Sequence, residues 1–92
     1  MDRFELEEEV KAIVARITKT PSSRLTLDTD LRADLNVDSL QGLQIVAAIE
    51  KRLEIKVPDE DIDMYTTVRT IIETIQRVQA DATIHKVRIQ SS

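Results

Sequence analysis

Ser39 is the side chain of this sequence best placed to do chemistry, because it lies where a loop becomes a helix, between Asp38 and Leu40. A helix N-terminus presents unpaired backbone N–H groups and a partial positive charge, and both favour a phosphate group attached there. Serine and aspartate are also ordinary helix N-caps. The tripeptide alone therefore leaves two interpretations open, a hydroxyl that carries a phosphate and a purely structural cap.

Metal binding and nucleophilic catalysis find little support among the other polar residues. The sequence has one His and no Cys, which nearly excludes zinc, and the acids at 59–63 lack the Gly and the distant Glu of a calcium loop. Ser39 has no G-x-S-x-G setting, and the only conceivable base is His85, near the C-terminus. We therefore predict a protein without a metal site and without catalytic residues, which is not an enzyme.

The spacing of apolar residues predicts three longer helices that position Ser39. They cover about residues 2–18, residues 38 or 39 to 53, and a last stretch that begins after a cap at Thr66 or Thr67. A short acidic helix is expected after Pro58, which suits a first helical turn. The predicted fold class is all-α, a small four-helix bundle with a long packed loop between the first and second helices.

The long connection at 19–37 is unusual, since most loops in compact domains are much shorter. Aspartates separate its four leucines, and we expect these leucines to pack onto the helices: Leu25, Leu27, Leu31 and Leu35. Residues 1–80 are predicted to form the domain. Residues 81–92 are predicted to be a helical extension or a loose C-terminal tail, because their strand-like alternation has no partner strand.

The second helix has two apolar stripes, although a surface helix in so small a domain needs one. The first is a predicted core stripe: Ile45, Val46, Ile49 and Leu53. The second begins beside Ser39: Leu40, Leu43 and Ala47. The second stripe is either a binding surface or a face covered by the loop or by a later helix.

Composition narrows the possible functions further. The chain has 92 residues, of which 41% are hydrophobic and 33% charged, with a net charge of −4 that argues against a nucleic-acid binder. Ten acids and four bases lie within 28–63, so the middle of the chain suits either a basic protein partner or simple solubility. No apolar run could span a membrane and no signal peptide is evident, so we predict a cytoplasmic monomer.

The residues around Ser39 resemble a known motif. Residues 34–40 read Asp-Leu-Asn-Val-Asp-Ser-Leu, which resembles the attachment motif of acyl carrier proteins, Asp-Leu-Gly, one variable residue, then Asp-Ser-Leu. Similar segments follow at 49–53, 55–60 and 65–68, and 9–14 looks like the first helix of that family. The resemblance covers roughly residues 5–78, and this ordered set of segments is far more specific than Asp-Ser-Leu alone.

The resemblance implies a carrier function. A phosphopantetheinyl transferase would move phosphopantetheine from coenzyme A to the hydroxyl of Ser39, and the thiol of the arm would carry acyl groups as thioesters. Asp38 and Leu40 would flank the attachment point, and Asp38 would cap the second helix and help basic partners to find the site. The partners would be acyl-transferring and condensing enzymes of fatty-acid or of polyketide and specialised-lipid synthesis. These enzymes would have basic docking surfaces and would supply the catalytic groups. The predicted partner-binding residues are Leu43, Ala47, Glu50 and Asp34.

Three departures from the family pattern stand out. Asn36 occupies the usual Gly position, and Asn is among the best non-Gly residues where φ is positive. Gly42 lies one turn after Ser39, either to make room for the arm or a partner, or through simple drift. Positions that are often acidic in housekeeping members carry other residues here: Gln41, Gln44, Lys51 and Arg52. These four residues favour a dedicated pathway over general fatty-acid synthesis.

Other functions stay open on the sequence. A carrier of D-alanyl, aminoacyl or peptidyl cargo is the nearest alternative, although Asp38 favours acyl cargo over the Gly-Gly-His-Ser pattern typical of peptidyl carriers. A helical interaction domain whose Ser39 is never modified is the alternative from a different class. It would explain the helices and the acidity, but not the context of Asp38, Ser39 and Leu40.

Overall fold

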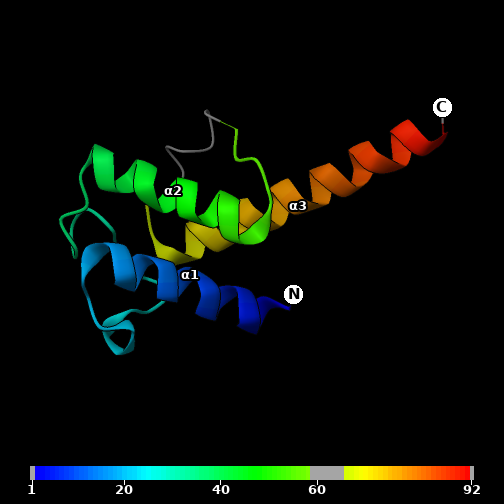
Figure 1. The fold of residues 1–92 in the computed structure, drawn as a ribbon. Coiled ribbons are helices and arrows are strands. Elements are labelled where there is room, and N and C mark those ends of the chain that lie inside the picture. Colours follow the sequence, from blue (N-terminus) through cyan, green and yellow to red (C-terminus); the bar gives the residue numbers. More distant parts are fainter. Residues whose placement is uncertain (1, 59–65, 92) are drawn as a thin grey trace.

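The structure is a computed structural model that describes residues 2–58 and 66–91, with side chains of the last helix described up to residue 80. Its helices are α1 (Arg3–Thr18), the short 3-10 helix η1 (Ser22–Arg24), α2 (Ser39–Leu53) and α3 (Val68–Ser91). In Figure 1, α1 ends at the side of the molecule where α2 and α3 begin. The start of α2 therefore lies on the same side of the molecule as the end of α1 and the start of α3.

The predicted all-α class is confirmed for the described residues, which contain no strand beyond one isolated bridge pair, Asp30 with Thr67. The four-helix count is not confirmed. The three longer helices are present, whereas the expected short acidic helix after Pro58 falls on residues 59–65, outside the described part of the chain.

Side-chain caps mark the starts of α1 and α3. The Asp2 carboxylate accepts a hydrogen bond from the N–H of Glu5 at 2.8 Å, so Asp2 is the N-cap of α1. At the start of α3, the hydroxyl of Thr67 accepts from the N–H of Thr70 at 3.2 Å, and the Thr70 hydroxyl accepts from the N–H of Thr67 at 2.9 Å. Of the two threonines considered, Thr67 is therefore the cap.

The core lies between the three helices, and each helix contributes one apolar stripe to it. The stripe on α1 is buried at Leu6, Val10, Ile13 and Val14. On α2, Ile45, Val46 and Ile49 are buried, and Leu53 packs partly buried against them. On α3, Val68, Ile71, Ile72, Ile75 and Val78 are buried. Apart from Val46 and Val78, these buried residues belong to one continuous hydrophobic cluster that the three helices share.

The long loop packs onto this core as predicted. Leu25 and Leu31 are buried, while Leu27 and Leu35 are partly buried against the same cluster. Backbone hydrogen bonds tie the loop to the start of α3: from Leu31 N to Thr66 O at 2.9 Å, from Val68 N to Thr29 O at 3.3 Å, and from Arg69 N to Leu27 O at 2.9 Å. We call these three bonds the loop clasp. They fix the segment that leads into Ser39.

The last helix is longer than the other two and continues past them (Figure 1), reaching Ser91. Of the two structures considered for residues 81–92, the backbone up to Ser91 is a helical extension. The division of the chain at residue 80 remains a prediction. Among the described residues, no helix is both long and apolar enough to cross a bilayer.

Candidate functional site

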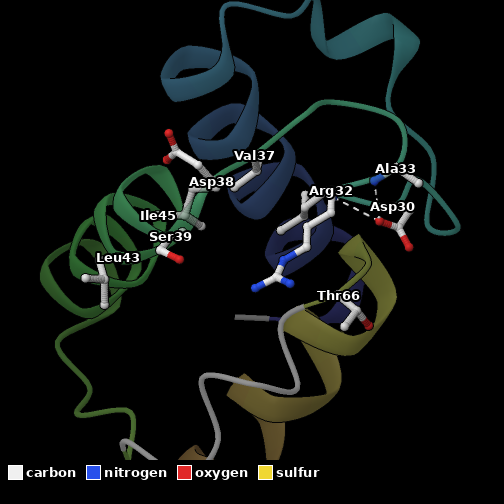
Figure 2. A pocket seen from close by; sticks show the side chains of 11 residues that line it. Asp30, Arg32, Ala33, Val37, Asp38, Ser39, Leu43, Ile45 and Thr66 are labelled. Carbon is white, nitrogen blue, oxygen red and sulfur yellow. Dashed lines mark hydrogen bonds between the residues drawn. The ribbon is translucent and has the colours of Figure 1, made fainter.

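Ser39 is the first residue of α2, and its side chain is exposed. The capping role belongs to its neighbour, since the Asp38 carboxylate accepts a hydrogen bond from the N–H of Gln41 at 2.8 Å. The Ser39 hydroxyl makes no hydrogen bond among the described residues. Figure 2 shows the Asp38 carboxylate and the Ser39 hydroxyl pointing in different directions. Asp38 therefore caps α2, and the exposed Ser39 hydroxyl is not used for capping. This leaves the hydroxyl available for a covalent modification.

The turn that leads to Ser39 depends on Asn36, which has a φ of 56°. This is the positive φ expected at the position where the family motif has Gly, and Asn tolerates it better than most residues. Val37 then turns back into the core, where it is buried and donates its N–H to the Leu31 carbonyl at 2.9 Å. The turn therefore sets both the direction and the depth at which α2 begins.

Two aspartates brace the preceding segment. The Asp30 carboxylate accepts from the N–H of Arg32 at 2.9 Å and from the N–H of Ala33 at 2.8 Å. The Asp34 carboxylate accepts from the N–H of Asp30 at 2.8 Å. Asp34 therefore holds the turn together, a structural contact that the sequence analysis did not predict. Its predicted role in partner binding stays a prediction.

A hollow of about 840 Å³ opens beside Ser39. It lies between the first turns of α2, the segment 30–33 and Thr66 at the approach to α3 (Figure 2). Gly42 forms part of its wall, and a Cβ added to Gly42 would meet no atom within 4 Å. The open space at Gly42 fits the expectation of room beside Ser39.

The second apolar stripe of α2 faces solvent. Leu40 is 65% exposed, Leu43 is 53% exposed, and Ala47 is also exposed. The alternative that the loop or another helix covers this stripe is therefore wrong for the described residues. Large exposed side chains so close to Ser39 form an apolar surface on which a partner could dock.

Glu50 sits at the other end of α2 and has a structural contact that the sequence did not reveal. Its carboxylate accepts a hydrogen bond from the N–H of Val57 at 2.8 Å, which ties the loop after α2 back onto the helix. Arg52 is paired as well, with Glu9 of α1 at 2.8 Å. Spacing along α2 could not predict either contact, because each partner lies on another segment.

No group of three metal-ligating side chains occurs within residues 2–58 and 66–80, where side chains are described. The acids at 59–63, weighed above as a metal site, lie outside the described residues. What the described residues bring together is a free hydroxyl at a helix start, a hollow beside it and an apolar surface along the helix. These features suit a residue that is modified and then presented to other proteins.

Comparison with known proteins identifies this combination. Residues 8–75 match the family model described as a phosphopantetheine attachment site. An acyl carrier protein of Treponema pallidum (strain Nichols) is 38% identical over 72 residues, which cover 78% of this chain and 92% of that protein. An acyl carrier protein of Rhodococcus erythropolis is 35% identical over 77 residues, covering 84% of this chain and 85% of that protein. The chain belongs to the acyl carrier protein family, whose cofactor is phosphopantetheine.

Proposed function

We propose that Ser39 carries the phosphopantetheine arm, and that the protein presents acyl groups on that arm to the enzymes that transfer and condense them. The observation that carries the proposal is the division of labour at the start of α2. Asp38 caps the helix, and the neighbouring Ser39 hydroxyl is exposed and unbonded among the described residues. When attached, the arm supplies a terminal thiol that holds acyl groups, which a chain without Cys cannot supply itself.

The surroundings of Ser39 fit a covalent phosphate. The first backbone N–H groups of α2 and the positive end of its dipole favour a negative charge at this point. The hollow beside Ser39 leaves space for the base of an arm, with Gly42 contributing no side chain to its wall. These residues are thus compatible with the cofactor, and they hold it without supplying a catalytic base.

We propose the exposed stripe of Leu40, Leu43 and Ala47 as the docking surface. The transferase and the acyl-transferring and condensing enzymes would pack on it, while Asp34 and Glu50 attract basic groups at the two ends of α2. One Glu50 oxygen is engaged by Val57, so its charge rather than a free oxygen is the part available to a partner.

We further propose a dedicated pathway, such as polyketide or specialised-lipid synthesis. Helix α2 presents Gln41, Gln44 and, in its last turn, Lys51 where a basic partner would favour acids. Arg52, expected to repel such a partner, is partly neutralised by Glu9. The test compares kcat/KM with that of a housekeeping carrier on one malonyl transferase. Equal values with equal salt dependence would contradict the proposal.

We also propose that the protein is cytoplasmic and that it carries acyl groups rather than aminoacyl or peptidyl groups.

The attachment site is tested by intact mass. The unmodified chain is incubated with coenzyme A, magnesium and a broad-specificity transferase, and it should gain the mass of one phosphopantetheine. Ser39→Ala should gain nothing, and Ser22→Ala is the matched control that should load normally. Loading of Ser39→Ala at any other serine would contradict the assignment, and an unmodified wild type would favour the interaction-domain alternative.

A further inference from the structure

Arg32 is the one basic residue among the described residues that line the hollow beside Ser39. Figure 2 shows its side chain reaching from the segment 30–33 into the space between α2 and Thr66. Its guanidinium forms no ion pair with any described residue. Two other arginines of the domain are held, Arg52 by Glu9 at 2.8 Å and Arg69 by Asp28 at 3.0 Å. Arg32 is therefore a cation placed at the site with its charge uncompensated by a close carboxylate.

The nearest aspartates are occupied by backbone groups instead. The Asp30 carboxylate accepts from the N–H groups of Arg32 and Ala33, and the Asp34 carboxylate accepts from the N–H of Asp30. These bonds fix the backbone from which the Arg32 side chain extends. They do not involve its guanidinium, which lies at the hollow. Asp38 in turn is bonded to the N–H of Gln41. Residues 30–38 thus carry three aspartates and one arginine, with Asp30 and Asp34 bonded within the turn and Asp38 capping α2.

We propose that the Arg32 guanidinium binds the phosphodiester of the arm on Ser39. This inference rests on the proposed function. A phosphodiester brings one more negative charge to a site that already has Asp30, Asp34 and Asp38 nearby, and like charges so close together raise the free energy of the loaded protein. Arginine offsets this charge, and its planar fork of N–H donors matches two phosphate oxygens at once. The pair would hold the base of the arm across the hollow, toward the segment 30–33.

A carboxylate at the far end of a dicarboxylic cargo is a different anion that the same guanidinium could meet. The phosphodiester is favoured because it is bonded to Ser39 itself, which lines the same hollow as Arg32, and because it is present whatever cargo is loaded. The carboxylate is treated as a competing outcome of the test.

The test uses the loaded protein, with the mass of one phosphopantetheine verified on each variant. The wild type is compared with Arg32→Gln, Arg32→Lys and the control Arg24→Gln, which removes the same charge from an exposed residue lining a separate hollow with Thr20. The Nε–H resonance of Arg32 is recorded by NMR before and after loading, at low and high salt, together with the phosphorus resonance of the arm. Arg32 is exposed, so its variants are expected to fold, and circular dichroism checks this.

Loading should shift the Arg32 Nε–H resonance, and high salt should reduce that shift because the pair is open to solvent. The phosphorus resonance should move in Arg32→Gln, return part of the way in Arg32→Lys, and stay in place in Arg24→Gln. The inference would be overturned if the Arg32 Nε–H resonance did not shift on loading. It would also be overturned if the phosphorus resonance moved equally in Arg32→Gln and Arg24→Gln. A shift that appears only when malonyl replaces acetyl on the arm would overturn it too, since the partner would then be the cargo. A wild type that gains no mass would overturn the proposed function as well.

Discussion

Helix α2 has two apolar faces, of which one is buried and the other is exposed to solvent. Ile45 and Ile49 are buried in the cluster that α2 shares with α1 and α3, and Val46 is also buried, whereas Leu40 and Leu43 on the same helix are more than half exposed. Both faces are apolar enough to form a core, so hydrophobicity alone does not tell which one does. The neighbours decide: the buried face meets the complementary stripes of two helices, and no described segment covers the exposed one. An apolar face kept in solvent is an unfavourable arrangement for an isolated chain, which is understandable if partners use it.

The comparison is tested most strongly on the buried face. Ile49→Ala removes a side chain with no exposed surface from the centre of the core. It should lower the free energy of unfolding by about 2–5 kcal/mol, because a cavity remains where the side chain packed. Urea denaturation followed by circular dichroism measures this. A loss below about 1 kcal/mol would show that the two faces do not differ as described.

The end of α2 should give an intermediate effect. Glu50→Ala leaves the N–H of Val57 without its acceptor and should cost about 1–2 kcal/mol of unfolding free energy. Glu50→Gln is the matched control, since it keeps an acceptor oxygen and loses only the charge. If Glu50 acts mainly as a structural tie, Glu50→Gln should retain most of the stability. Equal losses in both variants would assign its importance to charge instead.

Gly42 should respond in the opposite direction. Gly42→Ala places a Cβ in open space and removes the entropy cost of a helical glycine, so the free energy of unfolding should rise by up to about 1 kcal/mol. The same variant is then loaded and assayed with a partner enzyme. Normal transfer by a stabilised variant would indicate that Gly42 reflects drift, and slowed transfer would indicate that the room beside Ser39 is used.

The smallest effect on stability is expected on the exposed face. Leu43→Ala should change the free energy of unfolding by less than about 0.5 kcal/mol, since the side chain is 53% exposed. It should nevertheless raise KM for partner enzymes, because it removes apolar contact area from the docking surface. Phe4→Ala, which truncates an apolar side chain that is 70% exposed on α1, is the matched control outside the docking surface. A stability loss in the range of Ile49→Ala would place Leu43 in the core.

Much of this fold could be predicted from local chemistry. The N-cap at Asp2, the positive φ of Asn36 and the buried stripes all follow from the preferences of individual residues and from helical spacing. Asp38 and Ser39 are both good caps as residue types, and the family resemblance assigned the cap of α2 to Asp38; the hydrogen bond from the N–H of Gln41 to the Asp38 carboxylate confirms this. That the Ser39 hydroxyl makes no hydrogen bond among the described residues is seen only in the structure.

Contacts between distant segments were likewise beyond the sequence. Glu50 meets Val57 and Arg52 meets Glu9 only because the chain folds back, and helical spacing along α2 contains no information about either partner. For Arg32 a signal was available in the sequence, since it is the single basic residue between Asp28 and Asp38. Its position in the hollow, however, required the turn that Asp30 and Asp34 build.

The loop clasp has a consequence for folding kinetics. The bridge between Asp30 and Thr67 closes a large ring of chain that contains the whole of α2. Closing a ring of this size costs roughly 3 kcal/mol of chain entropy before the contacts inside it form. Helical propensity can start α2 early, but the approach to Ser39 acquires its final geometry only after the two ends of the ring have met. A transferase that requires this geometry would thus act only on chains in which the ring between Asp30 and Thr67 has closed. The attachment of the arm would then mark chains that have finished folding.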